Sequence, residues 1–558
     1  MAVLSMTSQV RSTSVVSNAA RENRGFRRSA AGVIFCLSLA NLLLLHISFG
    51  LNSPHFIGFR KTPLDPATQL RGLAAGLIAI GCVAAVFWVV LCMLRANGTR
   101  AARLAGNAGV LFVLAIAANT WRVSKDLTLP GNAASVFSPA AMIPLAIGGL
   151  ASVFAFYRWR NLVTRAAFAA VMCLSPLLAI TTATMLFKAL RSVPASVMAD
   201  GPVAPLIPHN NRSERRRIVW MIFDELDQRL LFQARPAGLS LPEFDLLRSQ
   251  AFHGEAAERP AFMTREAIPS LVFGRTVDEV RNGRAPELLF RFDGAANFQQ
   301  WTEAPSVFSE ARALGWSTAI IGWYMPYCRM FNEQVSACAW EPALSQISQE
   351  IPNEVPLARH AGLLLAKSLY YVPFAVRLRI GNPSAAQTQD IAKERASALH
   401  EFRSIREKAL SWVVDEKFDL VFVHWPVPHS PGIFTCKTGV VSAEGAGNYM
   451  DNLCLADRVL GEVRTALEQA RLWDQTTLLV SADHSLRDPK TELGYKGPSS
   501  PHVPFLMKVA GDNAAVRYER PFNTVASKAI LLDVMKGKLR KNADIGAYLD
   551  KRSATGWR

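Results

Sequence analysis

The chain has 558 residues, of which 50% are hydrophobic and 19% charged, and its formal net charge is +17. Ordinary soluble domains are roughly 25% charged, and this apolar composition excludes disordered and fibrous classes. The first 200 residues contain 18 Lys and Arg but only four Asp and Glu, whereas the remaining residues contain 43 Lys and Arg and 40 Asp and Glu. A nucleic-acid binder would concentrate its basic residues on a folded face. Here they lie between apolar stretches, which is typical of a membrane protein, so we expect no nucleic-acid partner.

Five uncharged apolar stretches occupy the first third of the chain. They are approximately Ala30–Leu51, Leu73–Leu94, Leu104–Trp121, Ala134–Tyr157 and Ala166–Phe187. Crossing a bilayer takes about 20 apolar residues. The first stretch is too long for a cleavable signal peptide, and further spans follow it. We therefore predict a cytoplasmic disordered tail over residues 1–29 and a five-helix transmembrane bundle over residues 30–190.

Basic residues in the short loops predict the orientation of this bundle. With the N-terminus inside, the inside flanks carry ten Lys and Arg and the outside loops carry five. Cytoplasmic loops of membrane proteins are enriched in such residues. Five spans then place everything after about residue 190 across the membrane. The expected location is a bacterial inner membrane, with the polar half in the periplasm.

The eight cysteines fall into two groups of four. One group lies in the predicted spans, where cysteine behaves as a small apolar residue. The other group is Cys328, Cys338, Cys436 and Cys454, whose spacing favours the pairs Cys328–Cys338 and Cys436–Cys454. Four cysteines allow three connectivities, and the sequence does not choose among them. A zinc knuckle is the alternative, although no CxxC occurs; disulfides would suit an oxidising periplasm.

The polar half has the pattern of an α/β domain. Residues 191–213 form a proline-containing linker, residues 214–545 the domain and residues 546–558 a tail. The strand candidates are Ile218–Phe223, Ser317–Ile321, Asp419–His424, Thr477–Ser481 and Pro504–Val509, with long helices at Gln389–Val414 and Tyr449–Leu472. Apolar strands separated by helices predict a mostly parallel sheet covered on both faces.

Polar residues stand at the ends of these strands. Asp224 follows the first strand, Asp483-His484 follow the fourth, and His502 precedes the fifth. Ligands of such sheets bind beyond the carboxyl ends of the strands, so we expect these side chains to converge. Two aspartates, an imidazole and a hydroxyl suit a divalent metal such as zinc. The candidate hydroxyl is Thr264, which needs a base or a metal to become a nucleophile.

Five elements in order resemble the sulfatase-like branch of the alkaline phosphatase superfamily. They are Asp224-Glu225 after a strand, Thr264 with Pro269 and Gly274, the segment Pro428-His429-Ser430-Pro431, Asp483-His484, and His502-Val503-Pro504. The match covers roughly residues 217–537. Together with the membrane anchor, it resembles phosphoethanolamine and phosphoglycerol transferases and membrane-bound sulfatase-like proteins.

This resemblance implies an α/β/α sandwich of the alkaline-phosphatase type with a mostly parallel central sheet. It implies that Asp224, Thr264, Asp483 and His484 bind one divalent metal, for which zinc is favoured and manganese, magnesium and calcium are alternatives. Thr264 would also be the nucleophile, and His429 and His502 would be catalytic. A true sulfatase needs a Cys/Ser-x-Pro-x-Arg segment, which this chain lacks. Sulfate-ester hydrolysis is therefore disfavoured.

Simpler interpretations exist for several of these residues. Thr264 favours the N-cap position of the helix that follows. Asp483-His484 could form an ordinary turn, and Glu225 could support the site or be solvated. His424 lies within a strand, and we leave it outside the predicted site.

The function expected from this pattern is a membrane-anchored, metal-dependent transferase. It would move a phosphoethanolamine- or phosphoglycerol-like group from a membrane phospholipid, through phospho-Thr264, to a periplasmic glycan or lipid. The first alternative is a hydrolase of phosphoester, phosphonate or sulfate-type esters on the same scaffold. The second is a non-catalytic membrane scaffold with a degenerate site.

Overall fold

The computed structural model describes residues 30–45, 47, 66–124, 158–190, 200–208, 217–282, 287–343, 356–369, 384–444, 447–487 and 500–553. The chain divides into two compact units, each described by itself. The helical unit comprises Met1–Ser53, Leu64–Ser192 and Ile351–Asn382, and the α/β unit comprises Pro54–Pro63, Val193–Glu350 and Pro383–Arg558.

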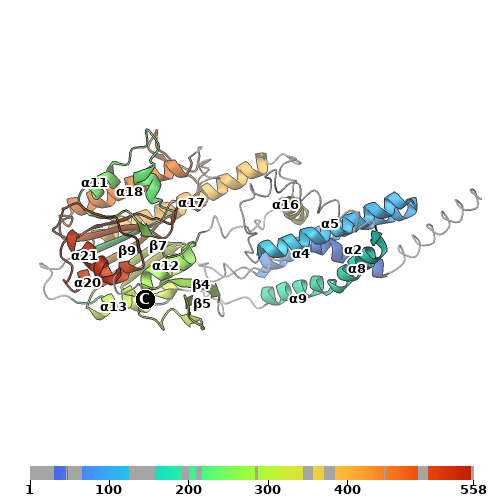
Figure 1. The fold of residues 1–558 in the computed structure, drawn as a ribbon, viewed down its shortest axis with the longest axis horizontal. Helices are drawn as coiled ribbons and strands as arrows, with labels where there is room; N and C mark the ends of the chain where they lie inside the picture. The colour runs from blue at the N-terminus through green and yellow to red at the C-terminus, as the bar shows by residue number, and fades with distance from the viewer. Residues whose placement is uncertain are drawn as a thin grey trace, which may run out of the picture. The chain divides into compact units, whose positions relative to one another are not determined.

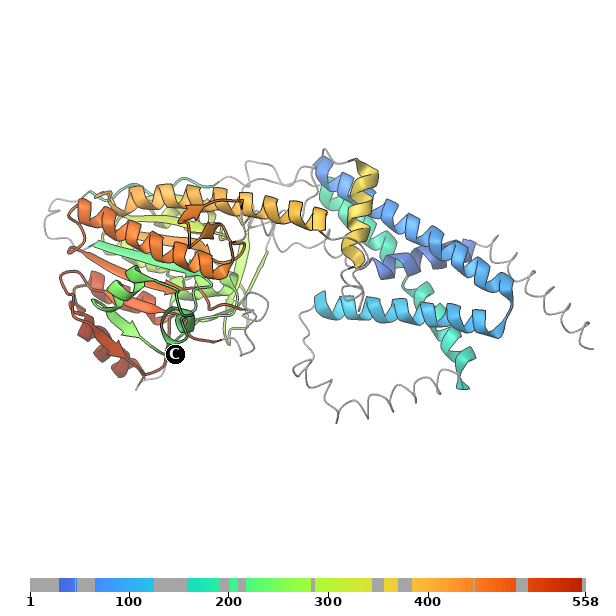
Figure 2. The ribbon, with the colours of Figure 1, turned by 90° about the horizontal axis from the view of Figure 1, so that it is seen from above.

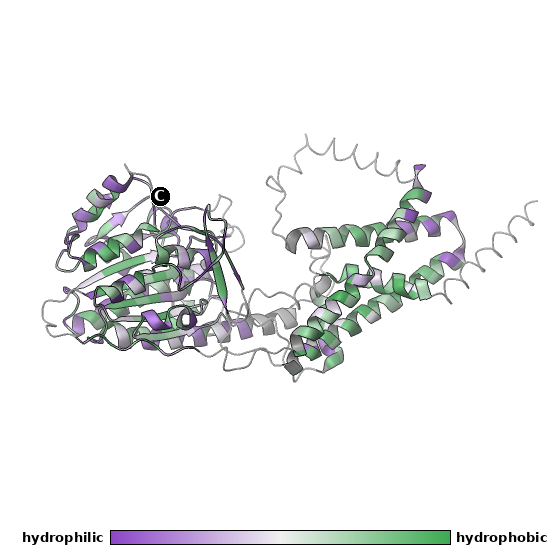
Figure 3. Cartoon of the chain, turned by 90° about the horizontal axis from the view of Figure 1, so that it is seen from below, coloured by the Kyte–Doolittle hydropathy of each residue, from purple (hydrophilic) through white to green (hydrophobic). Residues whose placement is uncertain are grey.

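The helical unit is built from apolar helices, coloured mostly green in Figure 3. They are α2 (Ala30–Leu43), α4 (Pro66–Asn97), α5 (Arg100–Ser124), α8 (Arg160–Cys173), α9 (Pro176–Leu190) and α16 (Leu357–Leu369). Among the described residues, three segments are long and apolar enough to cross a membrane: Gln69–Asn97, Arg100–Ala118 and Asn161–Phe187. Large apolar side chains on them remain exposed, including Val86 and Phe187. Such exposure is expected where lipid, not water, surrounds a helix.

Three of the five predicted spans therefore correspond to candidate spans of the structure. The first predicted span begins with α2, an apolar helix of 14 residues. The fourth, at residues 134–157, lies outside the described residues. A bundle of five spans stays a prediction.

Helix α16 comes from the second half of the chain but belongs to the helical unit. Ala361 is buried in the apolar cluster that also contains Phe35 and Ala79, and Leu357, Leu364 and Leu365 pack against it. Helix α16 contacts α4 directly. Helix α16 was not predicted from the sequence, because its 13 residues are too few to span a bilayer.

The α/β unit contains an eight-stranded sheet in the order β14-β2-β13-β12-β1-β9-β7-β8. The strands are β1 (Arg217–Asp224), β2 (Phe252–Gly254), β7 (Thr318–Trp323), β8 (Ala337–Glu341), β9 (Leu420–Pro428), β12 (Thr476–Ala482), β13 (Phe505–Lys508) and β14 (Val516–Tyr518). Strand β13 is antiparallel to both of its neighbours, and every other pair in the sheet is parallel. The predicted mostly parallel sheet is confirmed.

Helices cover both faces of this sheet (Figures 1 and 2). Helices α17 (Ser384–Val413) and α18 (Tyr449–Gln469) pack on β9. On the opposite face lie α12 (Thr264–Phe273), α13 (Val307–Ala313) and α20 (Ala526–Met535). Every residue of β1, β9 and β12 is consequently buried. Coverage on both faces explains why these strands have continuous apolar runs in place of an alternating pattern.

Smaller elements complete the α/β unit. They are α11 (Pro242–Arg248), α14 (Tyr327–Met330), α21 (Asn542–Ser553), β3 (Ala257–Glu258), β4 (Val277–Asn282), β5 (Leu288–Phe292), β6 (Gln299–Gln300), β10 (Phe434–Thr435), β11 (Val440–Val441) and β15 (Phe522–Asn523). Part of the segment predicted as a linker, residues 200–208, also packs on this unit. There the amide of Ala204 donates to the carbonyl of Val335, and that of Ile207 donates to Ser317 Oγ.

Two disulfides are present in the α/β unit. Cys328 in α14 is bonded to Cys338 in β8, and Cys436 is bonded to Cys454 in α18. This confirms the favoured pairing. The remaining cysteines, Cys36, Cys82, Cys92 and Cys173, are free and belong to the helical unit. Disulfides persist in oxidising compartments, so this distribution is that of a membrane-associated chain with an extracytoplasmic α/β unit.

Candidate functional site

The candidate site lies at the carboxyl edge of three adjacent parallel strands, β9, β1 and β12. Asp224 is the last residue of β1, and Asp483-His484 directly follow β12. Strand β13 is antiparallel to β12, so its first residue pairs near the end of β12, with Phe505 opposite Ser481. The chain direction thus places the segment before β13, including His502, at the same edge of the sheet.

Thr264 is the first residue of α12, and its hydroxyl points at this edge. Its Oγ1 lies 3.3 Å from Asp224 Oδ2 and 3.2 Å from His484 Nε2. The N-cap of α12 is Met263, and no side chain caps it. The N-cap interpretation of Thr264 is therefore wrong, because its hydroxyl is committed to the carboxylate and the imidazole.

Three potential ligand atoms at this site have no hydrogen-bond partner although they are buried. They are Asp224 Oδ1, Asp483 Oδ2 and His424 Nε2. One ligand atom from each of these residues lies within 4.8 Å of those of the other two. Orphaned buried polar atoms are costly and rare in folded proteins. Two carboxylate oxygens and an imidazole nitrogen are a suitable ligand set for a divalent cation such as zinc, so these residues fit a metal.

His424 is the residue that the sequence analysis leaves out of the site. It lies within β9, paired with Ile222 of β1 and Gly322 of β7, and is fully buried. Its position inside an apolar strand suggests a core histidine. The sequence feature that could have indicated a functional role is that His424 is the single ionisable residue in the run Phe422-Val423-His424-Trp425.

Backbone carbonyls fix the tautomers of the two central histidines. His424 Nδ1 lies 2.9 Å from the carbonyl oxygen of Trp323, and His484 Nδ1 lies 3.0 Å from that of Ser485. A carbonyl can only accept, so each Nδ1 carries the proton and each Nε2 presents its lone pair. The hydroxyl of Tyr327 also lies 2.9 Å from His424 Nδ1 and helps to hold the ring.

Burial sets the protonation of the cluster. It lowers the pKa of His424 to about 4 and also lowers the pKa of His484, so both rings are neutral, as metal ligands must be. Burial, followed by the charges of Asp483 and Glu225, raises the pKa of Asp224 well above its usual value. The pKa of Asp483 is lowered despite its burial, because His484 and His424 favour its charged form. A bound cation would compensate the two close carboxylates.

Arg487 connects the cluster to His429. Its Nε lies 2.8 Å from Glu225 Oε1, and its Nη2 lies 3.1 Å from His429 Nε2. Glu225 is buried, with φ of 65°, and its amide donates to Asp483 Oδ1 at 3.2 Å. Burial opposes ionisation of Glu225, but His429 and Arg487 lower its pKa. Glu225 therefore orients an arginine beside the site and is not a solvated acid.

The structure does not bring all of the predicted residues together. Asp224, Thr264, Asp483 and His484 form one cluster, and His429 adjoins it through Arg487. The backbone of His502 bridges Glu258, and its amide donates to Ser500 Oγ. Among the contacts of the described residues there is none between the His502 ring and the cluster. A catalytic role for His502 stays a prediction.

Ser485 directly follows Asp483 and His484 in the loop after β12. Its hydroxyl donates to the carbonyl of Ser500 and accepts from Arg259 Nη1, which is 2.9 Å away. These bonds join the loop after β12 to the segment before β13. The serine is therefore tied into the local structure.

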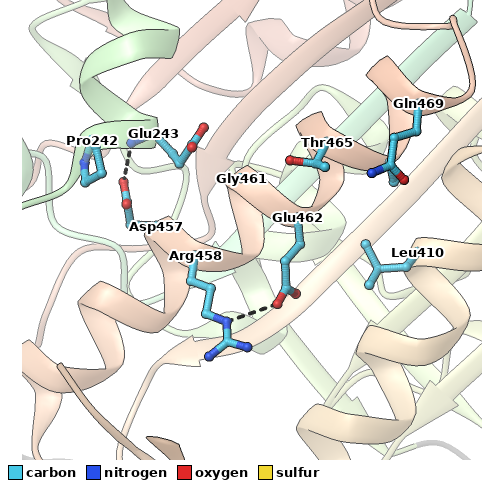
Figure 4. Close-up of a pocket in the computed structure, with 10 residues that line it drawn as sticks. Pro242, Glu243, Leu410, Asp457, Arg458, Gly461, Glu462, Thr465 and Gln469 are labelled. Atoms are coloured by element: carbon cyan, nitrogen blue, oxygen red, sulfur yellow. Dashed lines mark hydrogen bonds and ion pairs between the residues drawn. The ribbon is translucent and has the colours of Figure 1, made fainter. Parts of the chain in front are cut away.

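A second depression lies away from this edge, between α11, α17 and α18 (Figure 4). It has a volume of about 520 Å³ and is lined by none of the predicted site residues. Its carboxylates have structural partners: Asp457 accepts from the amides of Glu243 and Phe244, and Glu462 pairs with Arg458. We therefore place the functional site at the strand edge.

Solved structures similar to this chain are sulfatases and other members of the alkaline phosphatase superfamily. The PsFucS1 sulfatase from Pseudoalteromonas sp. is 13% identical, with 61% of this chain and 74% of that chain covered and a TM-score of 0.39. A protein in the alkaline phosphatase superfamily from Vibrio parahaemolyticus is 13% identical, with 60% and 68% covered and a TM-score of 0.35. The phosphonate monoester hydrolase of Agrobacterium radiobacter is 13% identical, with 58% and 74% covered and a TM-score of 0.34.

No family model matches the sequence, and a search of curated proteins found no match. The solved structures belong to the family that the sequence motifs resemble.

Proposed function

We propose that this chain is a membrane-anchored, metal-dependent transferase that moves a phospho-substituent from a phospholipid to an acceptor hydroxyl through phospho-Thr264. The observation that carries the proposal is the hydroxyl of Thr264, which lies within 3.3 Å of Asp224 Oδ2 and 3.2 Å of His484 Nε2. Such contacts with a buried carboxylate and a neutral imidazole suit a nucleophile whose proton must be removed.

The first step forms a bond between Thr264 Oγ1 and phosphorus and breaks the bond from phosphorus to the glycerol oxygen. The hydroxyl proton passes to Asp224 through Oδ2, which contacts Oγ1. Diacylglycerol leaves with a proton on its oxygen. The start of α12 favours the negative charge of the phosphoryl group, since helix N-termini attract anions.

Asp224, Asp483, His424 and His484 would hold the metal, together with Thr264. When bound, a divalent cation supplies Lewis acidity and lowers the pKa of a hydroxyl that it contacts. Zinc is favoured by the mixed oxygen and nitrogen donors, with manganese, magnesium and calcium as alternatives. Arg487, directed by Glu225, is suited to pair with the anionic substituent.

In the second step an acceptor hydroxyl attacks phosphorus and the bond to Thr264 Oγ1 breaks. Thr264 recovers its proton, and the acceptor loses one. His429 contacts Arg487 and is proposed to exchange a proton with the entering oxygen. His502 is proposed for the same task.

The helical unit supports a lipid as donor, because candidate membrane spans on the same chain keep the catalytic unit near a lipid surface. We propose a bacterial inner membrane, with the site in the periplasm and a periplasmic glycan or lipid as acceptor. The two disulfides support an oxidising compartment.

The test uses the purified full chain in vesicles of phosphatidylethanolamine and phosphatidylglycerol labelled in the head group, with zinc or manganese and lipid-linked glycans added. The proposal expects release of diacylglycerol and transfer of the label to the glycan. A variant Thr264→Ala controls for contaminating lipases. Label recovered free in solution would overturn the transferase in favour of a hydrolase, and absence of diacylglycerol release would favour a non-catalytic scaffold.

A further inference from the structure

A cavity of about 830 Å³ lies within the helical unit, between α2, α4, α5 and α8. It is separate from the candidate catalytic site, which belongs to the α/β unit. Its volume is within the range of roughly 300–1,000 Å³ that is typical of ligand pockets.

Four arginines line this cavity: Arg95, Arg100, Arg103 and Arg165. Arg95 belongs to the end of α4, Arg100 and Arg103 to the start of α5, and Arg165 to the first turns of α8. They gather because the turn between α4 and α5 is only two residues long and α8 contacts α5. In Figure 3, hydrophilic purple segments mark this end of the otherwise green helices.

No carboxylate lines the cavity, and the described part of the helical unit contains no Asp or Glu. The neutral polar groups of the lining include Asn107, whose Nδ2 donates to Thr164 Oγ1 at 2.8 Å. The positive charge that Arg100, Arg103 and Arg165 bring to the cavity thus meets no carboxylate among the lining residues. An anionic ligand would balance it.

The remaining walls are apolar. They include Leu94, Leu104 and Phe168, and the ring of Phe168 stacks on that of Phe35 with centroids 5.0 Å apart. A freely soluble anion would make no favourable contacts with these apolar side chains. A molecule with an anionic head and an apolar body fits both parts of the lining.

Ordinary positive-inside arginines provide a simpler explanation, because basic residues flank most cytoplasmic helix ends. Arginines that only set the orientation of a membrane protein need not line a cavity. Here four arginines from three helices line the same cavity. Basic pockets between transmembrane helices are suited to the head groups of anionic lipids. The predicted orientation places this end of the helices on the cytoplasmic side.

We propose that this cavity binds the phosphate-bearing head group of an anionic phospholipid, with the acyl chains along its apolar walls. The site is independent of Thr264 and of the proposed transfer reaction. The bound lipid would stabilise the packing of α5 and α8, whose mutual contact adjoins the cavity.

The test is native mass spectrometry of the full chain released from nanodiscs of equal parts phosphatidylglycerol and phosphatidylcholine. The wild type should retain one phosphatidylglycerol in preference to phosphatidylcholine. Each arginine near a membrane surface contributes roughly fivefold in affinity, so the triple variant Arg100→Gln, Arg103→Gln, Arg165→Gln should retain at least roughly tenfold less. The matched control is Arg158→Gln, which lies near the start of α8 but does not line the cavity.

A second variant removes space and leaves the charge unchanged. A Cβ at Gly106 would meet Leu94 Cδ1 at 3.5 Å and Leu91 Cδ2 at 3.8 Å, which are ordinary contacts, so Gly106→Leu should fold and fill part of the cavity. Loss of phosphatidylglycerol in this variant, with an unchanged circular dichroism spectrum, supports the proposal.

Equal retention of both lipids by the wild type, or equal loss in the Arg158→Gln control, would overturn it. Displacement of the lipid by an equimolar amount of glycerol 3-phosphate would show that a soluble phosphate is the ligand, and would also overturn it. The variant Thr264→Ala should keep the bound lipid. Failure of the transfer reaction therefore leaves this result unaffected.

Discussion

Arg487 and Glu225 form a partly buried ion pair beside the candidate site, with Nε 2.8 Å from Oε1 and only 7% of the Glu225 side chain exposed. The same guanidinium reaches His429 through Nη2 at 3.1 Å. Glu225 therefore fixes the direction of a positive charge next to Thr264, where a phosphoryl group would lie in the proposed reaction.

Replacement of this arginine should impair turnover more than folding. Arg487→Ala is expected to lower kcat by roughly a hundredfold, since a directed donor to a developing charge contributes that much in other enzymes. Arg487→Lys should recover part of the loss because the charge is kept. Diacylglycerol release from vesicles measures the effect. Arg406→Ala, which breaks the ion pair with Glu462, is the matched control, and an equal loss there would contradict the assignment.

Removal of the His424 ring should weaken metal binding. In His424→Gln the orphaned Nε2 is lost from the ligand set, and we expect the affinity for zinc to fall by at least roughly tenfold. Competition with a chelating dye measures the dissociation constant. His400→Gln, at an exposed position of α17, is the control and should keep the affinity of the wild type. Unchanged zinc affinity in His424→Gln would remove His424 from the site.

Asp457 should make stability depend on pH. Burial raises its pKa to about 7, against 3.8 for an ordinary aspartate. The folded state therefore binds more protons than the unfolded chain in this window, and the contribution of Asp457 to stability falls as the pH rises from about 4 to 7. Thermal unfolding of the full chain in detergent should show a flatter pH profile for Asp457→Asn. The same slope in both proteins would contradict this prediction.

Asp457→Ala should cost about 1 kcal/mol of stability, because the start of α11 loses the acceptor of two amide protons. Asp457→Asn keeps an acceptor and should lose less. The two variants thus separate the hydrogen bonds from the charge.

The disulfides should stabilise the α/β unit. Cys328 and Cys338 are 10 residues apart, and Cys436 and Cys454 are 18 apart. Closing loops of this size restricts the unfolded chain and contributes about 3 kcal/mol each. Cys436→Ser should lower the unfolding temperature, whereas Cys173→Ser, a free cysteine of the helical unit, should not. Maleimide labelling of the denatured, unreduced chain provides a second check, because only free thiols react.

The ends of the central strands could be predicted from the sequence, because a buried parallel strand is a continuous apolar run that ends at a polar residue. Asp224 and Asp483 stand at such stops, and the structure places both at one edge of the sheet. His424 was not predictable in this way, since β9 continues four residues beyond it to Pro428. Its role depends on which strands lie beside β9, and hydropathy carries no information about strand order.

The helical unit shows a similar limit. The apolar runs of α4, α5 and the segment Asn161–Phe187 are long enough for recognition from the sequence. Helix α16 is 13 residues long and belongs to this unit only through its packing on α4. A short amphipathic helix gives the same pattern whether it packs on a membrane helix or on a soluble domain.

Peptide mass spectrometry of the full chain, incubated with phosphatidylethanolamine or phosphatidylglycerol vesicles and zinc but without an acceptor, tests the nucleophile most directly. We predict a phospho-substituent on the peptide that contains Thr264, equal in mass to the lipid head group with its phosphate. The adduct should be absent from Thr264→Ala, and turnover should fall by roughly a thousandfold or more in that variant. Full turnover in Thr264→Ala, with an unmodified Thr264 peptide in the wild type, would contradict the account.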